Sequence, residues 1–418
     1  MDSEFKKNFI ALFTGTTAAQ AVAFLFEPII SRLFLPNEFA VFELYVAFIM
    51  MIGSVVTLRY EMAIILPKKK LNALNLMGLT FVITIVISLL TLIVFGLFGH
   101  SISQVLNNKD ITHYYWLIPI GVFIFGIYRG LVYWFMRQNK FALISSTKIT
   151  ESTTKALSTS LWGMMHFSSW GLVLGQFLGQ LFSIFPLLWK FIKQDRMLLS
   201  FITWKQMRHQ AKEHSVFPKV NVPQTIIDML QLSGVVFIIS AYFTPDILGQ
   251  YTKAIRIMVI PLSLIGTSIN QVFYQKAASL YQKGENLRAQ TTKISLVLAA
   301  ISVPFIIIGV LYSPQIFAFV LGDNWFQAGI MAAIMLPWFF LKLVLSVALS
   351  IPIIVNEQKT FLSISILGNL LLVASVLIGG SYFQDIYKTL YLLTWLQVAY
   401  NILLAIWLYK ITGKKTIR

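Results

Sequence analysis

The sequence contains no cysteine, which excludes disulfide bonds and thiolate metal sites. Histidine is also scarce, with five residues in a chain of 418. His209, Glu213 and His214 lie close together on a charged segment, but no further cluster of possible ligands accompanies them. We therefore expect neither a bound metal ion nor any other cofactor.

Charged side chains are few as well, and their scarcity excludes an ordinary soluble domain. They make up 12% of the residues, against 57% hydrophobic side chains and a mean hydropathy of +0.76. Runs of about 20 apolar residues, each long enough to cross a hydrocarbon core of about 30 Å, recur along the chain. Twelve runs predict an all-α polytopic membrane protein: 9–33, 39–66, 74–98, 112–136, 148–166, 170–189, 220–243, 250–275, 292–312, 327–354, 361–380 and 388–409.

Acidic residues number only 16, against 33 lysines and arginines. If the runs are spans, 24 of the basic residues lie on one side of the membrane and 2 on the other. The side that holds Lys68 to Lys70, Arg137 and the segment 190–219 is therefore predicted to be cytoplasmic, together with both termini. Nucleic acid is excluded as a partner because the charges are dispersed over many short loops.

An internal repeat relates the two halves of the chain. The stretch "IISRLFLPNEFAVF" at residues 29–42 aligns without gaps with "IISAYFTPDILGQY" at residues 238–251, with five identities in fourteen positions. The offset is 209 residues, half of the chain length. Each half contains six runs, so both halves would enter the membrane from the same side. Parallel repeats of this kind are a transporter architecture, with alternating access.

The segment 191–217 separates the two sets of six runs. It mixes aromatic, apolar and basic residues in a pattern suited to a helix on an anionic leaflet, although a plain solvated connector is the alternative. We expect an N-terminal six-helix lobe at 1–190, a cytoplasmic amphipathic linker at 191–217 and a C-terminal six-helix lobe at 218–418.

Charged residues inside the predicted spans are the candidate site. A charge at the bilayer centre costs roughly 2.5 to 3.5 kcal/mol, so these groups should face the protein interior or water. The bases outnumber the acids by two, which predicts a cationic, water-filled cavity for an anionic group such as diphosphate or an acidic sugar. The bases are Arg32, Arg59, Arg129, Lys155, Lys253, Arg256 and Lys342, and the acids are Glu27, Glu43, Glu61, Glu151 and Asp228.

Some of these charges have simpler explanations. Arg32 and Glu43 lie near helix ends and could reach the interface, and Glu151 and Lys155 could pair with each other. No such explanation applies to three of the bases, Arg59, Arg129 and Lys342.

The coupling-ion candidates are Glu27, Glu61, Glu151 and Asp228. The sequence lacks a phosphate-binding loop and a zinc-protease helix, so we expect no catalytic residues and no enzyme activity.

Four stretches resemble the bacterial polysaccharide flippases of the multidrug/oligosaccharidyl-lipid/polysaccharide exporter superfamily. These are "TGTTAAQAVAFLFEPIISRLFLPNEFAVFELY" from Thr14, "LRYEMAIILPKK" from Leu58, "FPKVNVP" from Phe217 and "LGDNWFQAGIMAAIMLPWFFLK" from Leu321. The resemblance implies two six-helix lobes forming a V, with a cavity lined chiefly by the first, second, seventh and eighth helices.

The same resemblance implies a substrate and a location. The substrate would be an undecaprenyl-diphosphate-linked oligosaccharide for O-antigen, lipopolysaccharide, capsule or exopolysaccharide biosynthesis, flipped from the inner to the outer leaflet of a bacterial inner membrane. H⁺ or Na⁺ would be the coupling ion, and polymerase and chain-length proteins of the same pathway would be candidate partners.

Two other functions stay open from the sequence. A multidrug/cation antiporter of the same superfamily would favour acids over bases in its cavity. A membrane glycan polymerase or ligase would need a large outer loop with catalytic groups, whereas the outer loops expected here, near 99–111 and 313–326, are short.

Overall fold

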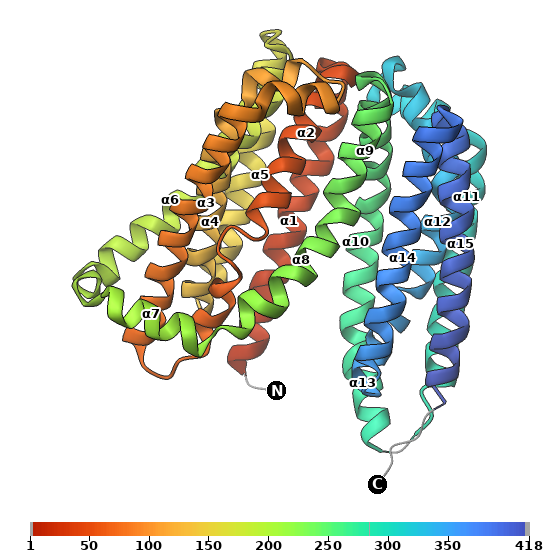
Figure 1. Cartoon of the computed structure of the whole chain (residues 1–418). Helices are drawn as coiled ribbons and strands as arrows, with labels where there is room; N and C mark the ends of the chain where they lie inside the picture. Colours follow the sequence, from red (N-terminus) through yellow and green to blue (C-terminus); the bar gives the residue numbers. More distant parts are fainter. Residues whose placement is uncertain (1–2, 284, 414–418) are drawn as a thin grey trace. The chain divides into compact units, whose positions relative to one another are not determined.

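The computed structural model describes the backbone of residues 3–283 and 285–413, and the chain termini lie outside this part. Within these residues every regular element is helical, as predicted (Figure 1). The α-helices are α1 Ser3–Leu33, α2 Pro36–Gly53, α3 Lys70–Val105, α4 Leu117–Arg137, α5 Phe141–Met164, α6 Ser168–Asp195, α7 Trp204–Glu213, α8 Val222–Met229, α9 Val235–Tyr242, α10 Pro245–Gln282, α11 Arg288–Leu321, α12 Phe326–Leu345, α13 Ile351–Ile354, α14 Gln358–Ile378 and α15 Ile386–Ile411.

The helices account for all twelve predicted spans. In the described part of the chain, nine helical segments are long and apolar enough to cross a membrane. The other three spans coincide with α1, α5 and α10, which are the less apolar long helices. The prediction of a polytopic, all-helical membrane protein is therefore confirmed.

The chain divides into two compact units, Met1–Ala241 and Tyr242–Arg418. Helix α8 and nearly all of α9 belong to the first unit. There the Ser240 hydroxyl donates a hydrogen bond to the Leu106 carbonyl at 2.5 Å, and the Phe48 and Phe237 ring centroids lie 4.7 Å apart. The lobe and linker boundaries expected from the sequence, at 190 and 218, stay a prediction.

The helix boundaries follow the internal repeat. Helix α1 ends at Leu33 and α2 begins at Pro36, while α9 ends at Tyr242 and α10 begins at Pro245. Both pairs of positions are 209 residues apart. Proline suits the first position of a helix because its missing N–H would have no partner there. The aligned stretches thus form the same helix–turn–helix junction twice.

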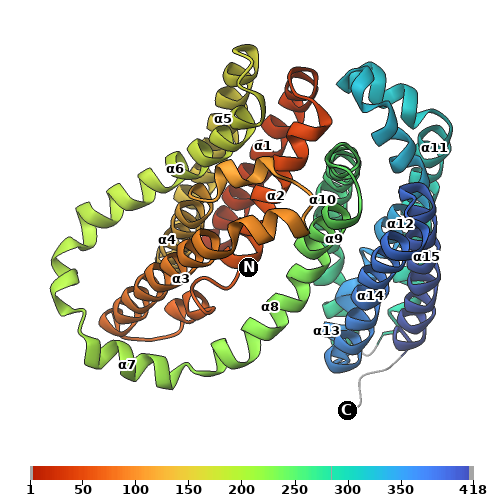
Figure 2. The ribbon, with the colours of Figure 1, turned by 45° about the horizontal axis from the view of Figure 1, so that its top comes forward.

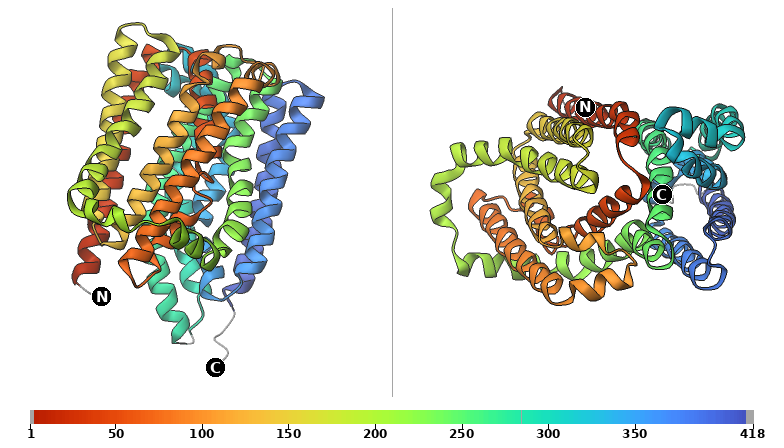
Figure 3. Two further views of the ribbon diagram at one scale, coloured as in Figure 1. Left: turned by 60° about the vertical axis from the view of Figure 1, so that its left-hand side comes forward. Right: turned by 90° about the horizontal axis from the view of Figure 1, so that it is seen from above.

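Close packing in the first unit depends on small residues and on a buried aromatic core. A Cβ atom built on Gly175 of α6 would lie 3.0 Å from the Thr159 Cβ and 3.1 Å from the Thr159 Cα of α5. The core includes Trp134 and Phe135 of α4, both fully buried. Helices α6, α7 and α8 follow one another as an arc alongside α3 and α4 (Figures 2 and 3).

Candidate functional site

The second predicted span, residues 39–66, is not one continuous helix. Helix α2 ends at Gly53, the chain makes tight turns from residue 54 to 59, and a 3₁₀ helix covers Tyr60–Ile65. The turns are closed by backbone bonds such as Leu58 N–H to the Val55 carbonyl at 2.8 Å. Non-helical backbone at membrane depth is tolerated only where it is buried in protein or lines a water-filled cavity. The break therefore marks an interior, polar part of the molecule.

Two adjacent residues at this break have a strained backbone. Leu58 and Arg59 are consecutive residues with positive φ, 48° and 63°. A bulky L-residue in this left-handed region costs about 1–3 kcal/mol, and such conformations cluster at functional sites. The strained pair places the Arg59 side chain at the start of the 3₁₀ helix that carries Glu61.

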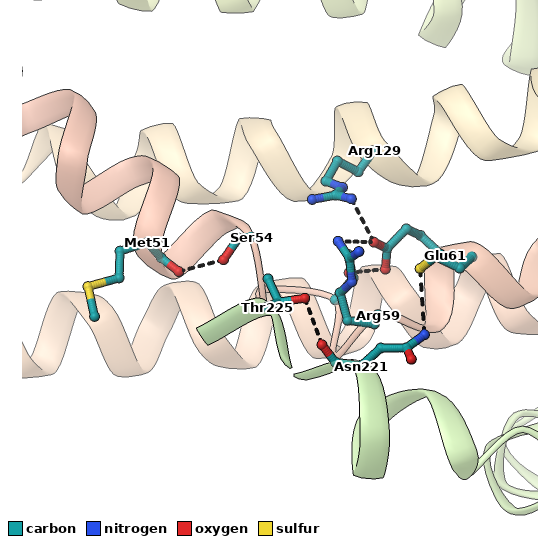
Figure 4. A network of polar contacts seen from close by, with 9 residues as sticks. Met51, Ser54, Arg59, Glu61, Arg129, Asn221 and Thr225 are labelled. Carbon is teal, nitrogen blue, oxygen red and sulfur yellow. Dashed lines mark hydrogen bonds and ion pairs between the residues drawn. The ribbon is translucent and has the colours of Figure 1, made fainter. Parts of the chain in front are cut away.

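Glu61 holds two guanidinium groups (Figure 4). Its carboxylate Oε1 lies 3.1 Å from Nη2 of Arg129 on α4 and 3.6 Å from Nη1 of Arg59. The Thr57 hydroxyl donates to the other oxygen, Oε2. The Glu61 side chain is 0% exposed, while the side chains of Arg59 and Arg129 are 18% and 21% exposed. A single buried carboxylate thus fixes two cations that both reach accessible space.

The charges in this network do not cancel. Two guanidinium groups and one carboxylate leave one net positive charge. A further acid, Asp228 of α8, is an exposed residue within electrostatic range of Arg59. In the part of the chain that the structure describes, the Arg59 Nε is buried without a hydrogen-bond partner. The arrangement can bind an additional anion through guanidinium N–H groups that Glu61 does not occupy.

Two polar neighbours of this network were not predicted from the sequence. Asn221, in the "FPKVNVP" stretch, directs its side-chain amide at the Met62 sulfur at 3.8 Å, and its backbone carbonyl accepts a hydrogen bond from the Thr225 hydroxyl at 2.6 Å. Thr57 precedes Glu61 by four residues. The only available signal for Asn221 was its place in the 217–223 stretch that carries the family resemblance, whereas Thr57 had none.

Other predicted site residues of the first unit lie on the α1–α5 pair. Helix α5 is held against α1 by a hydrogen bond from Ser152 to the Ala19 carbonyl at 2.6 Å. Along this pair Glu27 is buried, Arg32 is exposed, Glu151 is partly exposed, and the Lys155 ammonium lies 5.1 Å from the Phe42 ring centroid. Arg59, Glu61 and Arg129 instead belong to the α2 break and α4.

The second unit contains the remaining predicted bases. Lys253 of α10 is 1% exposed, and its ammonium lies 4.5 Å from the ring centroid of Trp325; Arg256 follows one turn later. The Lys342 ammonium of α12 lies 4.6 Å from the Trp338 ring centroid, and among the described residues no carboxylate pairs with it. The aromatic faces therefore stabilise these cations within apolar helices.

The sequence that forms this site matches a known protein family. The family described as "Polysaccharide biosynthesis protein" matches residues 29–330, which is well over half of the chain and includes Arg59, Glu61 and Arg129. The chain belongs to the polysaccharide biosynthesis protein family. Among curated proteins, no significant sequence match was found.

Solved structures show the fold of this polysaccharide biosynthesis protein. An inward-facing multidrug resistance MATE family transporter of the MOP superfamily aligns with a TM-score of 0.70 at 13% identity, covering 96% of this chain and 94% of that one. The MATE multidrug transporter DinF-BH aligns with a TM-score of 0.57 at 17% identity, covering 97% and 93%. A MOP superfamily transporter from Pyrococcus furiosus gives 0.54 at 13%, covering 98% and 97%. The protein thus has the fold of MATE-like transporters, as predicted.

Proposed function

We propose that this polysaccharide biosynthesis protein is a flippase for undecaprenyl-diphosphate-linked oligosaccharide repeat units, which it moves from the inner to the outer leaflet of a bacterial inner membrane. The family and the transporter fold support membrane transport in polysaccharide biosynthesis. The charge of the Arg59–Glu61–Arg129 network supports the choice of substrate, because a diphosphate head group is anionic and guanidinium groups bind phosphate oxygens in pairs.

The mechanism follows from the net charge of the network. Glu61 holds both guanidinium groups before the substrate arrives, so little side-chain ordering remains when a phosphate binds. The diphosphate binds the free N–H groups of Arg59 and Arg129, and Lys253, Arg256, Lys342, Lys155 and Arg32 are further cationic contacts in this proposal. Alternating access then exposes the head group to the other leaflet while the polyprenyl tail stays in lipid. No bond is made or broken, so no catalytic residue is needed.

Energy for net movement comes from an ion gradient in this proposal. Glu27, Glu151 and Asp228 are the acids proposed to carry H⁺ or Na⁺, and Glu61 is a fourth candidate. The excess of basic residues on one side supports a cytoplasmic location for both termini in this proposal. Polymerase and chain-length proteins, which would use the flipped repeat unit, are the proposed partners, with lipopolysaccharide O-antigen, capsule or exopolysaccharide as the product.

Removal of the cations tests this proposal. Arg59→Ala, Arg129→Ala and Lys342→Ala should each abolish surface glycan in a strain that depends on this protein. Exposed Lys109, in the segment before α4, provides the matched control Lys109→Ala, which should leave glycan unchanged. Immunoblots of the membrane fraction verify equal protein levels. Normal glycan in all three variants, Arg59→Ala, Arg129→Ala and Lys342→Ala, would refute the site assignment.

The multidrug/cation antiporter remains the second candidate because the solved structures that this fold resembles include multidrug transporters. The net positive charge of the Glu61 network argues against a cationic drug. One similar structure, the Pyrococcus furiosus transporter, is itself described as having a binding pocket of reverse polarity that suggests a different function. Ethidium transport by everted vesicles distinguishes the two: an antiporter should move ethidium into the vesicle lumen, whereas the flippase should show no uptake above vesicles that lack the protein.

A glycan polymerase or ligase is distinguished by the position of its accumulated substrate. Loss of a flippase should leave single repeat units linked to undecaprenyl diphosphate on the inner leaflet. Loss of a polymerase would leave them on the outer leaflet, and that result in a deletion strain would overturn our proposal.

A further inference from the structure

A second cationic site lies in the first unit, away from the Glu61 network. A cavity of about 470 Å³ is lined by Ile65, Lys70, Trp134, Arg137 and Gln138, where the 3₁₀ helix ends, α3 begins and α4 ends. This volume is within the range of small-molecule sites. The flippase proposal assigns no role to this cavity.

The two cations of the cavity are held in place by groups behind them. Arg137 donates through Nη1 to the Ile65 carbonyl at 3.1 Å and through Nη2 to the Lys68 carbonyl at 3.2 Å. A guanidinium has five N–H donors, so three remain for a ligand. Lys70 is 2.7 Å from the carboxylate of Asp195, yet its side chain is 53% exposed. Both side chains are therefore oriented before any ligand binds.

The local charge is strongly positive. Asp195 is buried and already accepts hydrogen bonds from Lys70 at 2.7 Å, Trp134 at 2.9 Å and Gln138 at 3.4 Å. Lys140 lies at the same end of the bundle, with its ammonium 2.5 Å from the Gln194 side-chain oxygen. Burial lowers the pKa of Lys140, and the nearby ammonium groups of Lys190 and Lys70 lower it further, while Asp195 raises it. This end of the bundle thus carries four cations, Arg137, Lys70, Lys140 and Lys190, and the carboxylate of Asp195 pairs with one of them, Lys70.

The cavity lining includes an apolar side chain, and exposed apolar residues adjoin the lining and basic residues in sequence. Ile65 in its lining is 38% exposed, and its neighbour Leu66 is 59% exposed. Leu71, next to Lys70, is 42% exposed, and Trp189, next to Lys190, is 65% exposed. A ligand of this site would therefore meet the cations Lys70 and Arg137 together with the apolar side chain of Ile65 in the cavity, on a part of the chain that also carries exposed apolar residues. An anionic phospholipid has this combination of a phosphate head group and acyl chains.

We propose that the cavity between the ends of α3 and α4 binds a phosphate group, and that its source is the head group of an anionic phospholipid. The ordinary preference of basic residues for the cytoplasmic side explains why lysines occur here, but it does not explain a cavity with a guanidinium fixed by two carbonyl groups. The bound phosphate takes the free donors of Arg137 and the exposed ammonium group of Lys70, and Lys140 adds electrostatic attraction from outside the cavity lining.

Native mass spectrometry of the purified, detergent-solubilised protein tests this site. The probes are dioleoylphosphatidylglycerol, dioleoylphosphatidylcholine and inorganic phosphate. We expect the wild-type protein to bind the phosphatidylglycerol at least tenfold more tightly than the phosphatidylcholine. Arg137→Gln should weaken that binding about tenfold and Lys140→Gln several-fold. Lys205→Gln, which removes one exposed charge from α7, is the matched control and should bind as the wild type does.

Testing two variants distinguishes a loss of binding from a folding defect. Lys140 is not part of the cavity lining, so Lys140→Gln leaves the contacts of Arg137 and Asp195 intact. If inorganic phosphate displaces the lipid and stabilises the protein equally, with the same dependence on Arg137, the site is confirmed and its ligand is free phosphate. Equal phosphatidylglycerol binding by wild type, Arg137→Gln and Lys140→Gln would overturn the proposal.

Discussion

Glu61 shows how a residue acquires its role from tertiary packing. Its two cationic partners are Arg59, two positions away, and Arg129, on a different helix. The cost of intramembrane charge predicted that Arg59 and Arg129 would avoid lipid. It could not predict that they share one carboxylate, because pairing between residues far apart in sequence is decided by how α4 packs beside the α2 break.

Neutralising the shared carboxylate should destabilise the protein. Glu61→Gln keeps the shape of the side chain but leaves two guanidinium groups close together without their counter-ion. Removing one partner of a buried ion pair costs about 3–5 kcal/mol, so we expect a clearly lower melting temperature in detergent. Exposed Glu285 provides the control Glu285→Gln, which should melt with the wild type. A Glu61→Gln variant of unchanged stability would show that the carboxylate is not the anchor of both arginines.

At the scale of elements, the sequence predicted helix packing better than helix continuity. The four-residue spacing of Gly171, Gly175 and Gly179 indicated a close-packing face, and in the structure all three pack at the α5–α6 contact. The break after Gly53 was not predicted. Apolar composition reports where a segment can be buried, but the positive φ angles of Leu58 and Arg59 depend on the polar contacts around them.

A methyl group at the α5–α6 contact should be poorly tolerated. Gly175→Ala places a Cβ against the Thr159 backbone, and overpacking of this kind costs about 1–3 kcal/mol. Gly96→Ala on α3 is the matched control, since a Cβ there would meet no atom within 4 Å. Thermal unfolding followed by size-exclusion chromatography should show a loss for the first variant only. Equal melting temperatures would mean that the α5–α6 contact is looser than described.

At the scale of the whole molecule, the sequence predicted the fold class and its internal repeat. Hydropathy located the spans, and the 209-residue offset located two equivalent junctions, because both depend on composition and local turns. The membership of α8 and α9 in the first unit had no comparable local signal. It depends on contacts such as that between Ser240 and Leu106, which only the folded chain brings together.

The orientation inferred from charge can be measured directly because the chain has no cysteine of its own. Lys69→Cys and Lys109→Cys replace exposed lysines at opposite ends of α3. In intact spheroplasts, a membrane-impermeant maleimide should label the cysteine at 109 and leave the one at 69 unlabelled. Permeabilised cells provide the control, in which both should react. Labelling only at 69 in the spheroplasts would reverse the orientation.

The complete burial of Glu61 between two arginines has a consequence for turnover. In the proposed transporter this carboxylate takes the position of a phosphate between the two arginines. The protein without substrate therefore does not expose two unpaired guanidinium groups to a low-dielectric interior. An arriving diphosphate is attracted by one surplus positive charge and not by two. A transporter must release its substrate as well as bind it. The Glu61 carboxylate keeps the affinity for each substrate low enough for release.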